Sequence, residues 1–252
     1  MTMEEFFAAH PDCAVAFSGG IDSAWLLHEA LRYGRRTRAY FVRTPFQPAF
    51  ELQDAQATAA ALGADLTVLE ADVLALPQVA ANPENRCYHC KRFLFTTLLA
   101  QAKGDGFPLV LDGSNASDDA GDRPGMAALR ELGIRSPLRE CGITKEDIRA
   151  QARAAGIALW DKPSYACLAT RIPVGTTITR EDLRRVEAGE SLLFSLGYTD
   201  FRLRLREQYA LLQVREEELE RTQAQLPELQ RQLAPLFPQV VLDPVPRPRR
   251  ES

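Results

Sequence analysis

An apolar run at residues 14–17 is followed without a spacer by the segment Ser18-Gly19-Gly20-Ile21-Asp22-Ser23. Apolar side chains then recur at helical spacing, so we predict a strand, a tight loop and a helix in immediate succession. Glycines at such a junction permit positive φ angles and let the backbone approach a ligand closely. The two serine hydroxyls and the N–H groups at the start of the helix can donate to an anion. The segment therefore predicts a phosphate-binding loop, although an ordinary strand-to-helix turn is the alternative.

The acidic residue of this loop suggests a metal ion beside the phosphate. Asp22 would repel a phosphate, so we expect it to hold Mg²⁺ next to one. The loop is not a Walker loop, because no Gly-Lys-Ser/Thr follows it. It resembles the pyrophosphate-binding loop of the PP-loop enzymes, which cleave ATP to AMP and pyrophosphate. This resemblance implies that Ser18, Gly19, Gly20 and Ser23 bind ATP.

Short apolar strands alternate with helical patterns in the first part of the chain. We predict strands at residues 13–17, 38–42, 66–69 and 109–111, and helices at 22–33, 50–62, 93–101 and from Thr144 to Gly156. The last of these helices starts with a capping box over Thr144 to Asp147. This alternation predicts an α/β fold with a parallel sheet covered by helices on both faces. In such sheets ligands bind beyond the carboxyl ends of the strands, which is where the glycine loop falls. A polar, glycine- and carboxylate-rich loop over residues 112–125 is a second candidate functional loop.

The composition changes near residues 174–175, which suggests a domain boundary. Beyond it the patterns predict a helix at 180–196, strands at 200–206, 209–214 and 240–242, and a polar helix before the last strand. We therefore predict a PP-loop domain over residues 1–173 and a small α+β domain over 174–243. A Pro- and Arg-rich tail over 244–252 is expected to be disordered.

Charge and composition narrow the classes of function. The chain has 252 residues, 46% of them hydrophobic, as in a globular protein with a substantial core. Its net charge of −4 gives no general electrostatic reason to bind nucleic acid. The first residues lack the plan of a signal peptide, and no apolar run reaches membrane-spanning length. We therefore expect a cytoplasmic protein without a membrane partner. Cys13 and Cys141 are expected to be buried or incidental thiols.

The other cysteines form a pattern that could carry chemistry. Without a secretion signal, cysteines favour thiols, metal ligands or redox chemistry over a disulfide framework. Cys87 and Cys90 form a Cys-x-x-Cys pair that would suit a thioredoxin-like redox site. Adding Cys167 and His89 would complete a zinc site. An iron–sulfur cluster on Cys87, Cys90 and Cys167 would leave one iron open to a sulfide or substrate atom. The spacing alone leaves these three interpretations open.

Several basic residues could bind anions. Lys91 follows the cysteine pair and could meet a phosphate or carboxylate as a point charge, although a solvated lysine is the alternative. Arg202 and Arg204 alternate with apolar residues, so one face of that predicted strand carries guanidinium groups. Such a face is either solvated or an anion site able to bind a phosphate bidentately.

Together these segments resemble one family within the PP-loop group, the ATP-dependent pyridinium-3,5-biscarboxylate mononucleotide sulfur transferases, or LarE family, of lactate racemase cofactor synthesis. The resemblance covers roughly residues 10 to 215. It is carried by the glycine loop and by the segments Arg86-Cys87-Tyr88-His89-Cys90-Lys91, 118–125 and 164–175.

The resemblance implies an enzyme that adenylates carboxylates of the pyridinium mononucleotide and then replaces the adenylate oxygen with sulfur, yielding a nickel-pincer cofactor precursor. Cys167 matches the family's sulfur-handling cysteine and Lys91 an active-site lysine. Arg202 and Arg204 match arginines that bind the substrate phosphate. Family members with the Cys-x-x-Cys pair hold a [4Fe-4S] cluster on three cysteines, whereas in others the matching cysteine gives up its own sulfur. The pair in this chain leads us to favour the cluster, held by Cys87, Cys90 and Cys167.

The chain departs from the family's pattern at one position, and the resemblance also implies an oligomer and a sulfide donor. Glu190 matches a metal-binding carboxylate of the family, but Gln213 stands where another carboxylate is expected. The family forms homo-oligomers, commonly trimer-based hexamers, and a cluster route implies a sulfide donor. The alternatives are another PP-loop enzyme, such as a tRNA thiolase or an amide-forming ligase, or a non-catalytic module that binds an adenine nucleotide or an iron–sulfur cluster.

Overall fold

The computed structural model describes residues 1–118, 124–161 and 165–248. The chain forms two compact units. The first comprises Met1–Val73 and Asn85–Ser164, and the second comprises Leu74–Glu84 and Tyr165–Ser252. The domain limits predicted from the sequence, 1–173 and 174–243, stay a prediction.

A four-stranded parallel sheet forms the centre of the first unit, with the strand order β3-β2-β1-β4. Its strands are β1 (Asp12–Ala16), β2 (Arg36–Arg43), β3 (Leu66–Glu70) and β4 (Val110–Leu111). Val15 of β1 pairs with Ala39 on one side and with Leu111 on the other. From β1 the chain adds β2 and β3 on one side before it crosses to β4 on the other. This change of direction places a crevice beside the carboxyl end of β1, where doubly wound sheets bind ligands.

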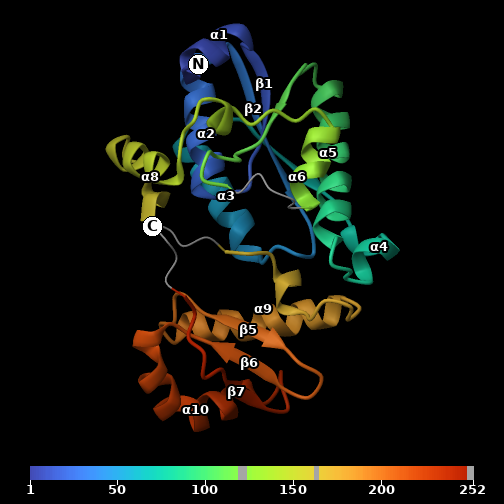
Figure 1. Cartoon of the computed structure of the whole chain (residues 1–252), viewed down its shortest axis with the longest axis vertical. Coiled ribbons are helices and arrows are strands. Elements are labelled where there is room, and N and C mark those ends of the chain that lie inside the picture. Colours follow the sequence, from blue (N-terminus) through green and yellow to red (C-terminus); the bar gives the residue numbers. More distant parts are fainter. Residues whose placement is uncertain (119–123, 162–164, 249–252) are drawn as a thin grey trace. The chain divides into compact units, whose positions relative to one another are not determined.

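Helices cover both faces of this sheet (Figure 1). They are α1 (Met3–Ala9), α2 (Ile21–Tyr33), α3 (Ala49–Ala61), α5 (Arg86–Gly104), α6 (Pro124–Glu131), α7 (Pro137–Glu140) and α8 (Lys145–Ala154), with the 3₁₀ turn η2 (Ala158–Asp161). Successive strand residues point to opposite faces. Val15 and Phe41 therefore pack with α1, α2, α3 and α8, whereas Ala14 and Tyr40 pack with α5 and α6. The predicted α/β fold with a doubly covered parallel sheet is confirmed.

Helix α5 begins earlier than the sequence suggested. We predicted it at 93–101, but it starts at Arg86, so the Cys-x-x-Cys pair lies on its first turns rather than in a loop. Pro83 and the polar residues after it resemble a loop, and the apolar periodicity becomes clear only from Phe93. The loop predicted over 112–125 also ends in a helix that we did not predict, α6. Residues 119–123 of that loop lie outside the described residues.

The second unit is a small α+β unit. Its sheet has the order β5-β6-β7. The central strand β6 (Ala210–Gln213) is antiparallel to β5 (Arg202–Leu205) and parallel to β7 (Val240–Leu242). Its helices are α4 (Pro77–Ala80), α9 (Arg180–Ser195) and α10 (Leu219–Leu233), with the 3₁₀ turns η3 (Leu168–Arg171) and η4 (Glu216–Glu218); η1 (Val73–Ala75) spans the border between the units. Leu203 is fully buried beneath α9, where a Cβ on Gly189 would lie 2.6 Å from its Cδ2. The predicted α+β architecture is confirmed.

A short segment from early in the chain completes this second unit. Asn82 is fully buried, and its φ of 54° lies in the left-handed region, which asparagine tolerates better than most residues. Its Nδ2 donates to the carbonyl oxygens of Ile172 at 3.3 Å and Pro173 at 2.7 Å. The N–H of Ile178 donates to the Ala80 oxygen at 2.7 Å. These bonds tie residues 74–84 to the segment after η3.

The last described residues make specific contacts. The predicted disordered tail starts at residue 244, yet the N–H of Arg247 donates to the Val214 oxygen at 2.8 Å. The Nε of Arg247 donates to Asp200 at 3.0 Å, and Gln213 donates to the Val245 oxygen at 3.0 Å. Residues 249–252 lie outside the described residues.

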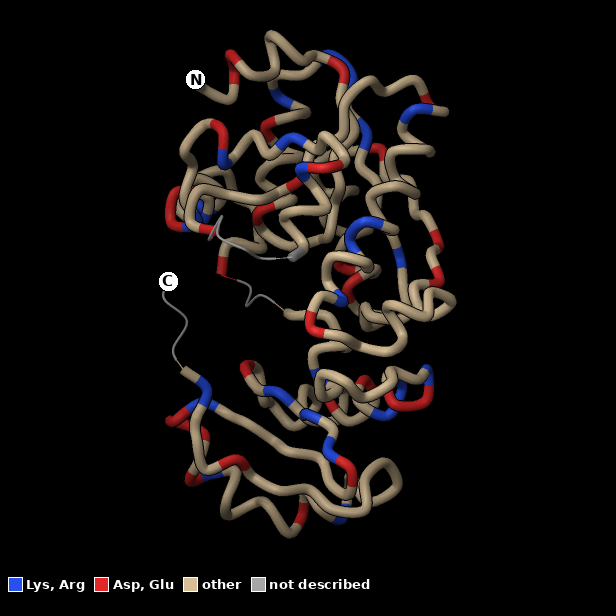
Figure 2. Tube along the Cα trace, turned by 45° about the vertical axis from the view of Figure 1, so that its right-hand side comes forward, with Lys and Arg blue, Asp and Glu red and all other residues tan. Residues whose placement is uncertain are grey.

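Basic and acidic residues are interspersed along the described chain in each unit (Figure 2). In the described part of the chain, no helix combines the length and the apolar character that crossing a membrane requires.

Candidate active site

The glycine loop lies between the carboxyl end of β1 and the start of α2, as predicted. Gly19 has a φ of 74°, and a Cβ there would lie 3.0 Å from the Cβ of Ala55 on α3. The Ser18 and Ser23 hydroxyls lie 3.1 Å apart, and Ser23 also donates to the Gly20 oxygen at 3.0 Å. Gly20 caps α2 without a side-chain hydrogen bond, so no side chain takes the cap position in front of the first N–H groups. The loop thus has the backbone of an anion-binding turn.

A lysine that the sequence pattern did not indicate lies at this loop. The Nζ of Lys145 lies 2.7 and 2.5 Å from the two carboxylate oxygens of Asp22. Both side chains are partly exposed, at 23% and 29%. Lys145 is the first residue of α8, whose predicted capping box between Thr144 and Asp147 is confirmed. The capping box located the helix, but nothing in the local sequence indicated that its first residue would reach Asp22.

The polar loop after β4 packs against the glycine loop. A Cβ on Gly113 would lie 2.9 Å from the backbone nitrogen of Ser23, so only glycine allows this approach. The Ser117 hydroxyl accepts from the N–H of Lys145 at 2.9 Å. Asp112 accepts from the hydroxyls of Ser114 and Ser136, each at 2.5 Å. The two loops and the start of α8 therefore form one continuous polar site.

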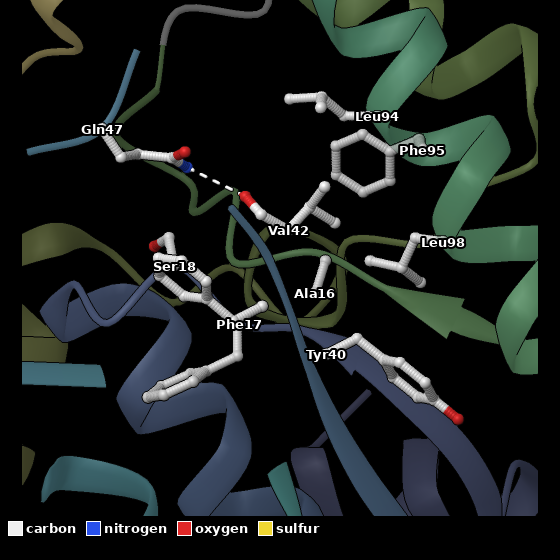
Figure 3. A pocket seen from close by; sticks show the side chains of 10 residues that line it. Ala16, Phe17, Ser18, Tyr40, Val42, Gln47, Leu94, Phe95 and Leu98 are labelled. Atoms are coloured by element: carbon white, nitrogen blue, oxygen red, sulfur yellow. Dashed lines mark hydrogen bonds between the residues drawn. The ribbon is translucent and has the colours of Figure 1, made fainter. Parts of the chain in front are cut away.

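An apolar cavity of about 130 Å³ opens beside this site (Figure 3). Its lining comes from the ends of β1 and β2, the residues that follow them, and α5: Ala16, Phe17, Ser18, Tyr40, Phe41, Val42, Gln47, Leu94, Phe95 and Leu98. Gln47 donates to the Val42 oxygen at 3.2 Å. Ser18 belongs both to the cavity and to the glycine loop. A ligand with a planar apolar ring and a phosphate chain suits this arrangement.

The cysteine pair lies on the helix that lines the cavity. Positions 87, 90, 91 and 94 follow helical spacing, so Cys87, Cys90 and Lys91 lie on the α5 face that also carries Leu94. At about 1.5 Å per residue, Cys90 is about 6 Å along the axis from Leu94. Cys87 is exposed and Cys90 half-buried. Lys91 packs against the start of α6, where a Cβ on Gly125 would lie 2.8 Å from its Cδ. The structure thus brings the pair and Lys91 to the side of α5 that faces the cavity.

The other predicted site residues belong to the second unit. Cys167 is the N-cap of η3, and η3 packs against β5. Along β5 the arginines alternate with leucines. The guanidinium of Arg202 lies 5.8 Å from the centre of the Tyr165 ring. Arg204 donates to the Gln213 oxygen at 2.7 Å.

The electrostatic surroundings of Arg204 favour an anion. Burial, followed by the positive charges of Arg247, Arg171 and Arg206, lowers the pKa of Arg204. A bound phosphate would offset this repulsion and could accept two hydrogen bonds from one guanidinium. The arginine face and the Cys167 turn therefore form a second candidate site within this unit.

Glu190 has partners that the sequence did not indicate. It is 1% exposed, and its Oε1 accepts from Arg171 at 2.7 Å and from the N–H of Leu203 at 3.2 Å. Its Oε2 accepts from Arg171 at 3.2 Å and from the Tyr165 hydroxyl. A metal ion at Glu190 would have to displace these donors. Across the described ranges, no three His, Cys, Asp or Glu side chains are grouped so as to hold a metal ion.

The parallel sheet, the glycine loop after β1 and the cavity beside it define an α/β protein of the PP-loop class. No protein-family model matches the sequence. Over 204 residues, the chain is 34% identical to the pyridinium-3,5-bisthiocarboxylic acid mononucleotide synthase of Lactiplantibacillus plantarum. The aligned region is 80% of this chain and 74% of that protein. The chain therefore belongs to the family of this synthase, the LarE family, which confirms the resemblance at family level.

Two further relatives cover similar shares of the chain. An uncharacterized protein of Synechocystis is 37% identical over 219 residues, which is 86% of this chain and 82% of that protein. An uncharacterized protein of Methanocaldococcus jannaschii is 31% identical over 203 residues, which is 81% and 77% respectively.

Proposed function

We propose that this protein is an ATP-dependent sulfur transferase that converts carboxylates of pyridinium-3,5-biscarboxylic acid mononucleotide to thiocarboxylates. The observation that carries the proposal is the glycine loop with its Lys145–Asp22 pair beside an apolar cavity, in a member of the LarE family. The name of the Lactiplantibacillus relative supports the choice of substrate.

ATP would lie along the cavity and the glycine loop. The adenine ring suits the apolar lining from β1, β2 and α5, and Ser18 marks where the phosphate chain would begin. The N–H groups of Gly19 and Gly20 and the start of α2 would bind the β- and γ-phosphates. Asp22 would hold Mg²⁺, because its carboxylate is partly exposed. Its observed partner, Lys145, has a flexible side chain whose ammonium group can bind phosphate instead.

The reaction would follow from making a carboxylate attackable. A substrate carboxylate oxygen attacks the α-phosphorus, pyrophosphate leaves, and an acyl adenylate forms. Lys145 and the loop N–H groups stabilise the charge that develops on the pyrophosphate. A sulfur nucleophile then attacks the acyl carbon and AMP leaves, which gives the thiocarboxylate. Arg202 and Arg204 would hold the substrate phosphate, and Lys91 would offset the charge of a carboxylate or phosphate.

The sulfur would be handled by three cysteines. Cys87 and Cys90 present two thiols on one face of α5, as expected of two ligands of one cluster, and Cys167 would be the third ligand. A [4Fe-4S] cluster held by these three cysteines would supply the sulfide for the transfer, and an external donor would replace it. In the alternative route Cys167 gives up its own sulfur and dehydroalanine remains. The Cys87–Cys90 pair favours the first route.

Pyrophosphate release tests the proposal directly. Adding the pyridinium dicarboxylate mononucleotide to enzyme and ATP should release pyrophosphate, and Asp22→Asn should abolish this release. Cys167→Ala should retain it while forming no thiocarboxylate, whereas the control Cys141→Ala should retain both steps. If wild-type protein released no pyrophosphate, the proposed function would be wrong.

Two measurements separate the sulfur routes. Protein isolated anaerobically should contain iron and labile sulfide, and its polypeptide mass should be unchanged after turnover. A loss of one H₂S from Cys167 would instead establish the sacrificial route. Colourless, iron-free protein that still turned over repeatedly would exclude both.

A further inference from the structure

A fully buried arginine holds the turn that carries Cys167. The side chain of Arg171 is 0% exposed. Its NH1 group donates to the Ala166 oxygen at 3.1 Å and to the Thr170 hydroxyl oxygen at 2.7 Å, so it contacts the chain on both sides of Cys167. Thr170 in turn donates from its hydroxyl and its N–H to the Cys167 oxygen, at 2.8 and 3.0 Å. The backbone of Cys167 is therefore fixed through one guanidinium.

The same network reaches the arginine strand. Glu190 on α9 accepts from Arg171, and its Oε1 also accepts from the N–H of Leu203 at 3.2 Å. Leu203 stands between Arg202 and Arg204 in β5. One buried carboxylate thus links the Cys167 turn to the strand that carries the candidate phosphate-binding arginines.

Stability alone does not account for this pair. Replacing a buried ion pair with neutral groups of similar size is often without loss of stability, because the desolvation of both charges opposes their attraction. A planar guanidinium with bidentate partners instead fixes direction and distance. Geometry of this kind matters where a sulfur atom must meet an acyl carbon, since a misplacement of about 1 Å can lower a rate by on the order of 10²-fold.

We propose that Arg171 and Glu190 are positioning residues that fix Cys167 relative to the phosphate site on Arg202 and Arg204. In this assignment Glu190 acts through Arg171 and Leu203 and is not a metal ligand. The step that the pair serves, sulfur transfer, rests on the proposed function. The network itself does not.

The test is a charge-neutral double variant, Arg171→Met with Glu190→Gln. The glutamine keeps one acceptor oxygen for the N–H of Leu203, and its NH2 group can donate to the Tyr165 hydroxyl oxygen. The bonds from Arg171 to Ala166 and Thr170 are lost. Thermal unfolding should show that this variant is folded. Its pyrophosphate release and its KM for the pyridinium substrate should stay within about twofold of wild type, whereas its single-turnover sulfur transfer should be at least tenfold slower. Normal sulfur transfer in this folded variant would overturn the proposal.

The control uses the same substitutions at an exposed ion pair of the same unit. Arg231 and Glu228 pair on α10, with exposed fractions of 76% and 46%. Arg231→Met with Glu228→Gln should leave both steps unchanged. If this control also slowed sulfur transfer alone, the effect would not be specific to the network, and the proposal would be overturned.

A second pair of variants applies if the buried double variant fails to fold. Thr170 is exposed and bridges Arg171 to Cys167, so both Thr170→Ser and Thr170→Val should fold. Serine keeps the bridging hydroxyl and should keep sulfur transfer. Valine should slow that step severalfold without changing the KM. Equal rates in the two variants would overturn the proposal.

Labelling of Cys167 separates this inference from the proposed function. If wild-type protein released no pyrophosphate, the function would be wrong, but the positioning network could still be measured. Iodoacetamide labelling of Cys167 in protein freed of any cluster, followed by peptide mass mapping, should differ severalfold between wild type and the Arg171→Met, Glu190→Gln variant, or between the two Thr170 variants. Unchanged labelling in the folded variants would overturn the network itself.

Discussion

Replacing Gly19 with alanine tests how much the glycine loop depends on its backbone. Gly19 has a φ of 74°, where an L-residue is disfavoured by about 1–2 kcal/mol. The new Cβ would also lie 3.0 Å from the Cβ and 3.2 Å from the Cα of Ala55. Ordinary carbon contacts are about 3.5–4.0 Å, so this overpacking should add roughly 1–3 kcal/mol. Gly19→Ala should therefore destabilise the first unit by about 2–5 kcal/mol.

Gly63 provides a matched control. Its φ is 68°, but a Cβ there would have nothing within 4 Å, so Gly63→Ala should show only the backbone contribution of about 1–2 kcal/mol. Adding Ala55→Gly to Gly19→Ala should relieve the contact with the Ala55 Cβ but not the contact with its Cα, so it should recover only part of the packing contribution. Glycine inside α3 should itself cost about 1 kcal/mol.

Tryptophan fluorescence during urea unfolding measures these differences. The two tryptophans of the chain, Trp25 and Trp160, both belong to the first unit, so their fluorescence reports its unfolding. Gly19→Ala should also weaken ATP binding by at least tenfold, about 1.4 kcal/mol, whereas Gly63→Ala should not. Equal destabilisation by both variants, with ATP binding intact in Gly19→Ala, would refute this reasoning.

Four further predictions concern the same unit. Lys145→Met should change the free energy of unfolding by less than about 1 kcal/mol, because its ion pair is partly exposed. It should nevertheless slow pyrophosphate release by about 10²–10³-fold. The control Lys103→Met, at an exposed lysine in the last turn of α5, should change neither stability nor pyrophosphate release. Burial raises the pKa of Cys13 from 9.0 to about 11, so iodoacetamide at pH 8 should label the exposed Cys87 of cluster-free protein but spare Cys13 until urea is added. Because this folded-state pKa lies above the unfolded one, stability should fall as the pH rises from about 9 to about 11, and less so in Cys13→Ala; equal slopes would contradict the assignment. Gly113→Ala would place a Cβ 2.9 Å from the Ser23 nitrogen and should weaken ATP binding in a titration; unchanged affinity would show that the loop can shift.

Local sequence determined most of the secondary structure. The predicted strand at 66–69 is observed at Leu66–Glu70, and the predicted helix at 22–33 is observed at Ile21–Tyr33. Both follow from the periodicity of apolar residues, which records the buried face of each element. The start of α5 was missed because its first two turns carry polar and thiol side chains, so the periodicity is absent where the site begins.

The sequence by itself also identified the glycine loop and the cysteine pair, because each is a contiguous segment whose residue types carry its chemistry. Together with the other matching segments they indicated the family. Only the tertiary structure decided which distant groups meet. Lys145 reaches Asp22 across 123 positions of the chain, and Glu190 joins Arg171 to the backbone of Leu203. These contacts arise from how α8 packs near α2 and how η3 and β5 pack with α9. Residue spacing encodes the conformation of a segment, whereas contacts between segments depend on the packing of the whole fold.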